Sequence, residues 1–412
     1  MSQKRPELLI PASSLEVLKT AVMFGADAVY IGGEAFGLRA KAKNFSMEDM
    51  KKGVEFAHAH GVKVHVTVNI LAHNDDLEGA AEYLKELKEI GPDALIIADP
   101  AIFMLAKEIC PEIERHVSTQ ANNTNYGTFN FWWNLGAKRV VTARELSLKE
   151  IREIRAHIPA EMEIESFIHG AMCISYSGRC LLSNFFTGRD ANQGACTHPC
   201  RWKYSVVEET RPGEYMPVYE NERGTYIFNS KDLCMIEHIP EMIDAGIDSF
   251  KIEGRMKTAL YVATVARTYR KAIDDYLEDP KKYEANMPWY RDQISNCTYR
   301  QFTTGFYFGK PGDESQIYDS NTYIKEYTYL GIIGGIKDGM YRIEQRNKFS
   351  VGETVEIMKP DGQNVEVTVE KIIDEDGQEQ ESAPHPKQVL YVALSGEASV
   401  YDILRRQEGV TE

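Results

Sequence analysis

Short apolar runs alternate with amphipathic stretches along the first 255 residues of the chain. Eight strand-like runs lie at residues 8–11, 28–31, 63–69, 94–98, 115–118, 139–143, 163–168 and 250–253. Continuous apolar runs, in contrast to alternating ones, are typical of strands that are buried on both faces of a parallel sheet. The pattern therefore predicts eight parallel strands separated by helices.

The stretches between these runs carry helix start and stop signals. Three begin with a serine that is followed three residues later by a carboxylate, at Ser13 and Glu16, Ser46 and Asp49, and Ser147 and Glu150. Four end at a glycine, at Gly25, Gly61, Gly136 and Gly246. Eight β/α units in this length predict a TIM-like (β/α)8 barrel. A doubly wound sheet is the alternative, but no G-x-G-x-x-G follows the first strand.

The pattern changes to short alternating strands near residue 327. Such runs lie at residues 330–336, 339–345, 353–359, 364–373 and 388–394, with a turn at 359–362. They predict a small C-terminal β-barrel. We expect a (β/α)8 barrel over 1–275, a connector over 276–325 and the β-barrel over 326–412. A cysteine-rich insertion at about 170–235 follows the seventh strand, and its pattern predicts a hairpin between 204 and 226.

Composition and charge narrow the class of protein. The chain is 43% hydrophobic and 26% charged, and no apolar run approaches the roughly 18 residues of a membrane helix. A strand-like run follows the N-terminus at once, so we expect no targeting segment, a cytoplasmic location and no membrane partner. The net charge of −15 disfavours a general nucleic-acid binder. Basic residues nevertheless gather in 170–204 and 249–271, which favours an anionic substrate at one site.

Five of the seven cysteines are grouped, at positions 173, 180, 196, 200 and 234. The number is too low for a disulfide scaffold, and thiols grouped in a reducing compartment more often hold a metal. Only the pair at 196 and 200 has the spacing of a zinc knuckle. The irregular spacing favours an iron–sulfur cluster, with structural zinc and plain buried thiols as the alternatives.

Polar residues follow most of the predicted strands, where a (β/α)8 barrel carries its chemistry. The candidate catalytic residues are His169, as an acid or base, together with Glu253 and Arg255. Glu253 can pair with Arg255, or it can position the edge of a nucleobase by a hydrogen bond. The candidate substrate-binding residues offer cationic or amide groups for carboxylates and phosphates, and they are Arg39, Asn122, Arg179, Arg201 and Lys257.

The segment that begins at Glu165 resembles the signature of peptidase family U32. The matching positions are Glu165, Phe167, Gly170, Ala171, Cys173, Gly178, Cys180 and Ser183. Despite the family's name, its well-understood members resemble oxygen-independent hydroxylases that act on ubiquinone precursors, ribosomal RNA or the wobble uridine of tRNA. A chain of this length with one small C-terminal domain most resembles the tRNA branch, which makes 5-hydroxyuridine.

The same resemblance implies the cofactor, the co-substrate and the partners. Family members carry a [4Fe–4S] cluster, and the family spacing maps its four ligands to Cys173, Cys180, Cys196 and Cys234, with Cys200 as an alternative ligand. In the tRNA branch prephenate is implied as the hydroxyl donor. The partners implied are tRNA and a second U32-family protein.

Two rival classes of function remain open at this point. The family name records a peptidase, but neither an H-E-x-x-H motif nor a G-x-S-x-G motif is present, and grouped thiols suit ligation better than one activated nucleophile. The second rival class is a non-catalytic RNA-binding module, which the polar residues at the ends of the predicted strands disfavour. Cys110 and Cys297 are interpreted as structural thiols.

Overall fold

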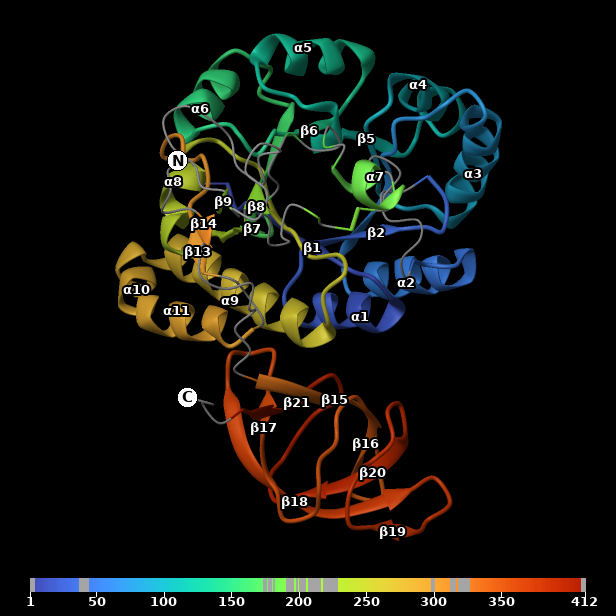
Figure 1. Cartoon of the computed structure of the whole chain (residues 1–412), viewed down its shortest axis with the longest axis vertical. Coiled ribbons are helices and arrows are strands. Elements are labelled where there is room, and N and C mark those ends of the chain that lie inside the picture. Colours follow the sequence, from blue (N-terminus) through green and yellow to red (C-terminus); the bar gives the residue numbers. More distant parts are fainter. Residues whose placement is uncertain are drawn as a thin grey trace. The chain divides into compact units, whose positions relative to one another are not determined.

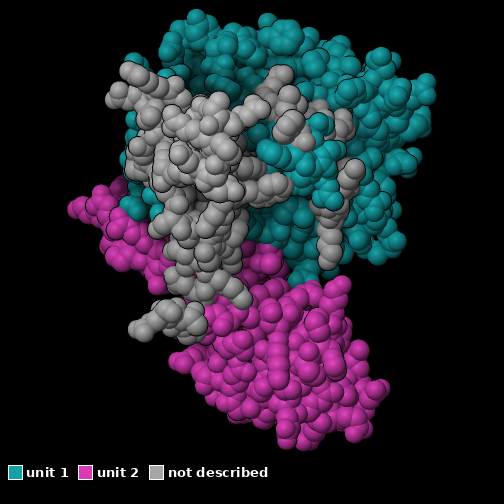
Figure 2. All heavy atoms as spheres, in the orientation of Figure 1, with its two compact units in different colours: residues 1–22, 26–257, 300–322 teal, residues 23–25, 258–299, 323–412 magenta. Residues whose placement is uncertain are grey.

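The computed structural model divides the chain into two compact units (Figures 1 and 2). Unit 1 comprises residues 1–22, 26–257 and 300–322, and unit 2 comprises 23–25, 258–299 and 323–412. The residues that the structure describes are 4–36, 44–172, 176, 180, 182–189, 196–197, 199, 205–206, 216–217, 229–297, 301–311, 316–317 and 327–408.

Unit 1 is built around a closed barrel of eight parallel strands, as predicted (Figure 1). The strands are β1 (Glu7–Pro11), β2 (Ala28–Gly32), β3 (Lys63–Val68), β4 (Ala94–Ile97), β5 (Glu114–Val117), β6 (Arg139–Val141), β7 (Glu163–Gly170) and β12 (Ser249–Ile252). They pair in chain order, and β12 closes the ring by pairing with both β7 and β1. Each strand falls on one of the eight predicted apolar runs.

Helices connect successive barrel strands, and their ends follow local sequence signals. In unit 1 they are α1 (Leu15–Met23), α2 (Met47–Ala59), α3 (Asp76–Ile90), α4 (Pro100–Ile109), α5 (Tyr126–Leu135), α6 (Leu148–Ala156), α7 (Leu182–Thr187) and α8 (Ile239–Asp244). Two short 3-10 turns are η1 (Thr119–Ala121) and η3 (Ile236–His238). Ser147 and Glu150 form the predicted capping box of α6, because each side chain bonds the other residue's backbone N–H. Gly136, after α5, has the left-handed backbone (φ +100°) that the helix end requires.

The insertion after β7 returns to the barrel beside the strand from which it left. Strand β11 (Asp232–Cys234) pairs antiparallel with β7, so that Leu233 lies opposite Gly170 and Cys234 opposite His169. Strand β13 (Phe302–Thr303) then adds parallel to β11. Within the insertion, β8 (Ser205–Val206) pairs antiparallel with β9 (Met216–Pro217), as the predicted hairpin requires. Strand β10 (Asn229–Ser230) pairs with β14 (Gln316–Ile317).

The barrel interior near the amino ends of the strands holds ion pairs. Arg139 on β6 contacts Glu7 on β1 at 2.5 Å and Glu165 on β7 at 3.0 Å. Lys251 on β12 contacts the other oxygen of Glu165 at 2.6 Å. Burial raises the pKa of the Glu165 carboxyl, but Lys251 and Arg139 outweigh it and lower the pKa to about 2. Since β6 and β1 are not neighbours in the ring, the Arg139–Glu7 pair spans the barrel interior.

Unit 2 combines three helices with the C-terminal β-barrel. The helices are α9 (Ala259–Glu278), α10 (Pro280–Ala285) and α11 (Met287–Ser295). The segment expected to be a connector therefore contains α10 and α11. The buried Arg267 of α9 donates to the carbonyl oxygens of Lys359 (2.8 Å) and Gln363 (3.3 Å). By spatial contacts, residues 258–299 group with the β-barrel. The domain boundaries expected at 275 and 325 concern which segments fold by themselves, and they remain predictions.

The C-terminal β-barrel is antiparallel and closed, as predicted. Its strands are β15 (Tyr327–Lys337), β16 (Met340–Gln345), β17 (Thr354–Met358), β18 (Asn364–Asp374), β20 (Val389–Leu394) and β21 (Ile403–Gln407), and β19 (Glu379–Gln380) extends it beside β18. Pairing of β17 with β18 closes the ring. The core includes Leu330, Ile343 and Phe349. Among the described residues of both units, no helix is long and apolar enough to span a bilayer.

Candidate active site at the carboxyl ends of the barrel strands

The carboxyl ends of β7 and β12 lie in close contact. The Glu253 N–H donates to the His169 carbonyl oxygen at 2.8 Å. Gly170 has φ +111°, and a Cβ at this position would lie 2.6 Å from the Glu253 carbonyl oxygen. Both the backbone conformation and the available space therefore require glycine here, which explains this position of the family signature.

His169 lies inside this junction. Its side chain is buried, its ring centroid is 5.7 Å from that of Phe302, and Cys234 lies opposite it in the sheet. Burial, with a smaller contribution from the positive charge of Lys257, lowers the pKa of His169 to about 3. The imidazole is therefore neutral at physiological pH, and three predicted site residues, His169, Lys257 and Glu253, share this end of the barrel.

Glu253 pairs with Arg144, a residue of the loop after β6. The Arg144 Nη2 atom, from the loop after β6, lies 2.8 Å from Glu253 Oε2. Its Nη1 atom donates to the Ala171 carbonyl oxygen at 3.2 Å, and the guanidinium stacks 4.1 Å from the Phe167 ring centroid. Arg144 thus joins the ends of β6, β7 and β12. The sequence placed Arg144 among the polar residues at the predicted strand ends, but Arg144 was not chosen as a catalytic or binding residue.

Arg255, three residues after the end of β12, contacts β3. Its Nη1 atom donates to Thr67 Oγ1 at 2.7 Å. A Cβ on Gly32 would lie 2.3 Å from the same nitrogen, so a glycine at the end of β2 makes room for the guanidinium. The nearby Tyr83 hydroxyl is buried and has no hydrogen-bond partner within the described part of the chain. Tyr83 is on α3, where no sequence pattern marked it.

Asn122 follows η1, which begins two residues after β5. It has a left-handed backbone (φ +54°), and its Nδ2 donates to the Gln120 carbonyl oxygen at 2.9 Å. In the ring, β5 is two strands away from β7, so Asn122 belongs to a different part of the rim from His169. The predicted binding residues Arg39, Arg179 and Arg201 lie outside the described residues.

The cysteines separate into two groups. Cys110 and Cys297 are buried and donate to backbone carbonyl oxygens of Ala106 (3.4 Å) and Ile294 (3.1 Å), which agrees with structural roles. Cys180, Cys196 and Cys234 are not in disulfides and are at least partly accessible. Cys173 and Cys200 lie outside the described residues, so the predicted ligand set stays a prediction.

The fold and this site define a (β/α)8-barrel protein with a polar, cation-bearing rim and a cysteine-rich insertion at one strand end. The chain belongs to peptidase family U32: the family model matches residues 13–317, and the model of the U32 C-terminal domain matches residues 325–405.

Three relatives show the range of the similarity. The chain is 43% identical to tRNA hydroxylation protein P1 of Bacillus subtilis, over 98% of this chain and 95% of the relative. It is 39% identical to tRNA hydroxylation protein P of Escherichia coli, over 92% of each chain. It is 40% identical to the 23S rRNA 5-hydroxycytidine C2501 synthase of Escherichia coli, over 68% of this chain and 41% of the relative.

Proposed function

We propose that this protein is a tRNA-modifying enzyme that hydroxylates the wobble uridine to 5-hydroxyuridine without molecular oxygen, using a [4Fe–4S] cluster and prephenate as the hydroxyl donor. The observation that carries the proposal is the 43% identity to a tRNA hydroxylation protein over 98% of this chain. The rRNA synthase, in contrast, is matched over only 41% of its length, so rRNA is the weaker candidate substrate.

Cationic groups at the rim support an anionic co-substrate. Arg144 and Arg255 are largely buried, and Lys257 is half-buried beside His169. Guanidinium groups bind carboxylates in a forked geometry, and prephenate has two carboxylates. In this proposal Arg144 and Arg255 orient the carboxylates, and Glu253 holds the Arg144 guanidinium in place.

The donor chemistry of the insertion fits an iron–sulfur cluster. Soft thiolate ligands select iron–sulfur clusters, and Cys180, Cys196 and Cys234 are thiols outside disulfides, of which Cys234 lies opposite His169. Together with Cys173 they would hold the cluster, which when bound supplies one-electron chemistry. The buried, neutral His169 would exclude water on that side and offer one ring nitrogen as a hydrogen-bond acceptor.

The proposal is tested by anaerobic purification of wild type and Cys180→Ala, with iron and sulfide analysis and incubation with unmodified tRNA. We expect about four iron atoms per chain, and 5-hydroxyuridine only with wild type and prephenate together. A matched control is Cys297→Ala, which removes a buried thiol and should keep both iron and product.

Three other results would redirect the assignment. Product on 23S rRNA but not on tRNA would make the protein an rRNA hydroxylase. Cleavage of a peptide by the cluster-free protein would restore the peptidase. Product formed only after a second U32-family chain is added would establish the partner as part of the enzyme.

A further inference from the structure

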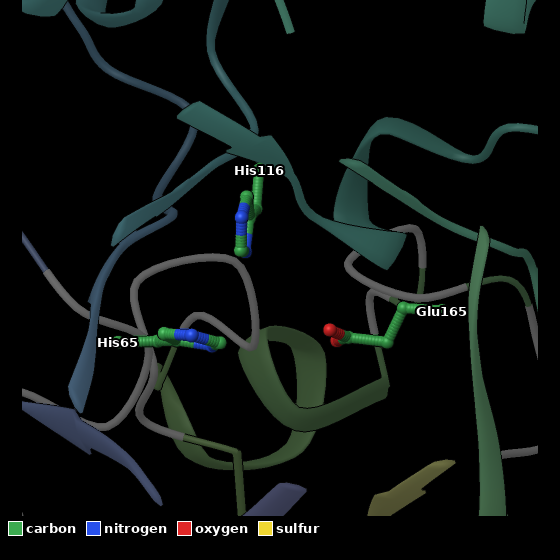
Figure 3. A group of neighbouring side chains, drawn as sticks. All are labelled: His65, His116 and Glu165. Carbon is green, nitrogen blue, oxygen red and sulfur yellow. The ribbon is translucent and has the colours of Figure 1, made fainter. Parts of the chain in front are cut away.

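A second group of ligating side chains lies inside the barrel, away from the cysteines. His65 on β3, His116 on β5 and Glu165 on β7 come from alternate strands and point toward one another (Figure 3). All three are at most 1% exposed, and one ligating atom from each lies within 4.8 Å of the others. Among the residues that the structure describes, this is the one group of at least three histidine, cysteine or carboxylate side chains whose ligating atoms lie close enough to hold one metal ion.

The two histidines have the arrangement of metal ligands. Their ring centroids are 4.8 Å apart and the rings are nearly perpendicular, at 85°. The His116 Nε2 atom lies 3.0 Å from Glu114 Oε2, which fixes the tautomer with a proton on Nε2 and a lone pair on Nδ1. A histidine that ligates a metal through one nitrogen usually donates through the other to a carboxylate in this way.

The remaining ring nitrogens support the same interpretation. Nδ1 of His65 and Nδ1 of His116 are buried without a hydrogen-bond partner among the described residues. An imidazole nitrogen that carries no proton has a lone pair that a metal ion can accept, so each buried Nδ1 atom is a candidate ligand atom.

Glu165 is held in place but keeps free acceptor capacity. Oε1 accepts from Lys251 at 2.6 Å, and Oε2 accepts from Arg139 at 3.0 Å and from the Ser249 hydroxyl at 3.4 Å. A carboxylate offers about four lone-pair directions, so one on Oε1 remains. Hydrogen bonds from basic groups to a ligating carboxylate orient it, although the two cations also weaken the attraction for another positive ion.

We propose that His65, His116 and Glu165 bind a single Zn²⁺ ion inside the barrel, at a site separate from the cysteine cluster. Two imidazoles and one carboxylate are an established zinc donor set, with water as the fourth ligand. Zinc–ligand bonds of about 2.0–2.2 Å place ligand atoms about 3.3 Å apart in a tetrahedron, so binding draws the three side chains inward from their present separation. This proposal gives Glu165, the first residue of the family signature, a function that is separate from the candidate active site.

The test is zinc analysis of the full-length protein, purified anaerobically and dialysed against Zn²⁺ and then against a weak chelator. Wild type should retain about one zinc ion per chain, and His65→Gln should lose it while keeping its iron. Because a substitution in the core can impair folding, Glu114→Gln provides the second variant. Glu114 is 44% exposed, and loss of such an outer carboxylate should weaken zinc binding about 10- to 100-fold.

Two controls make the outcomes distinguishable. His58→Gln removes a surface histidine paired with Asp93 and should leave zinc binding unchanged. Cys180→Ala should lower iron but not zinc. The proposal is overturned if wild type retains no zinc, because the two Nδ1 atoms would then bind a buried water instead. It is also overturned if Cys180→Ala loses zinc and His65→Gln keeps it, because the zinc would then be bound by the cysteines.

Discussion

At the residue scale, the candidate active site depends on Gly170. We expect Gly170→Ala to destabilise the protein by about 3 kcal/mol or more, because a Cβ would combine an unfavourable positive φ with contact at 2.6 Å to the Glu253 carbonyl. Gly61→Ala is the matched control: its φ is +71° but no atom lies within 4 Å, so only about 1 kcal/mol is expected. Thermal unfolding of both variants measures the difference, and equal losses would show that the close approach is unimportant.

Arg144 is the second residue on which the site depends. Arg144→Lys keeps the positive charge but cannot bond Glu253 and the Ala171 carbonyl in one planar fork, so we expect kcat/KM for prephenate to fall at least about tenfold. The control is Arg152→Lys, at an exposed pair with Asp244 on the outer helices. Unchanged kcat/KM in Arg144→Lys would remove Arg144 from the site.

The sequence predicted which strand ends carry several of these residues, and single residues show where that prediction stopped. His169, Glu253 and Lys257 lie together because chain order at strand ends is readable from the apolar runs. The contact between Glu253 and Arg144 was not predicted, since Arg144 is 109 residues away in the chain and only barrel closure brings the two together. The convergence of His65 and His116 was not predicted, because they lie on different strands and only barrel closure brings their rings together.

At the element scale, Asp275 holds together the helices of unit 2. Its carboxylate accepts from Lys271 at 2.8 Å, Asn286 at 2.8 Å and Tyr290 at 2.6 Å. Burial raises the pKa of this carboxyl, but the hydrogen bonds from Lys271, Tyr290 and neighbouring groups outweigh it and hold the pKa well below its usual value. The ionised form thus stabilises α9, α10 and α11 above about pH 4, and this contribution is lost as the pH falls further.

We therefore expect Asp275→Asn to lower stability by about 3 kcal/mol at pH 7 and by progressively less below pH 4. The adjacent Asp274→Asn is the control, because Asp274 is 49% exposed and forms a surface ion pair with Arg270 one helical turn away. Urea unfolding of both variants at several pH values tests this. A deficit in Asp275→Asn that does not vary with pH would contradict the assigned ionisation.

Strand β21 was not predicted from the sequence. Its residues Ile403–Gln407 include two arginines and read as polar, yet the strand lies between β15 and β17 in the C-terminal β-barrel. Arg405 is buried because Glu356 pairs with it at 2.5 Å and the Tyr327 ring stacks on its guanidinium at 4.0 Å. A charged residue can occupy a barrel core when partners distant in the chain supply the compensation, which local patterning cannot show.

At the scale of the whole molecule, the two units predict how a truncated chain behaves. Removal of residues 323–412 takes away the carbonyl acceptors of the buried Arg267, so we expect α9, α10 and α11 to exchange amide hydrogens much faster, with strands β1–β7 unchanged. Hydrogen-exchange mass spectrometry on both chains measures this. Equal protection of the three helices would instead support the boundaries predicted at 275 and 325.

The most direct measurement of the central claim is nucleoside analysis by mass spectrometry of tRNA from cells that lack this protein. Wild type supplied on a plasmid should restore 5-hydroxyuridine and its derivatives, Cys297→Ala should do the same, and Cys180→Ala should not. Unchanged 5-hydroxyuridine in the cells without the protein, or full restoration by Cys180→Ala, would contradict a cluster-dependent tRNA hydroxylase.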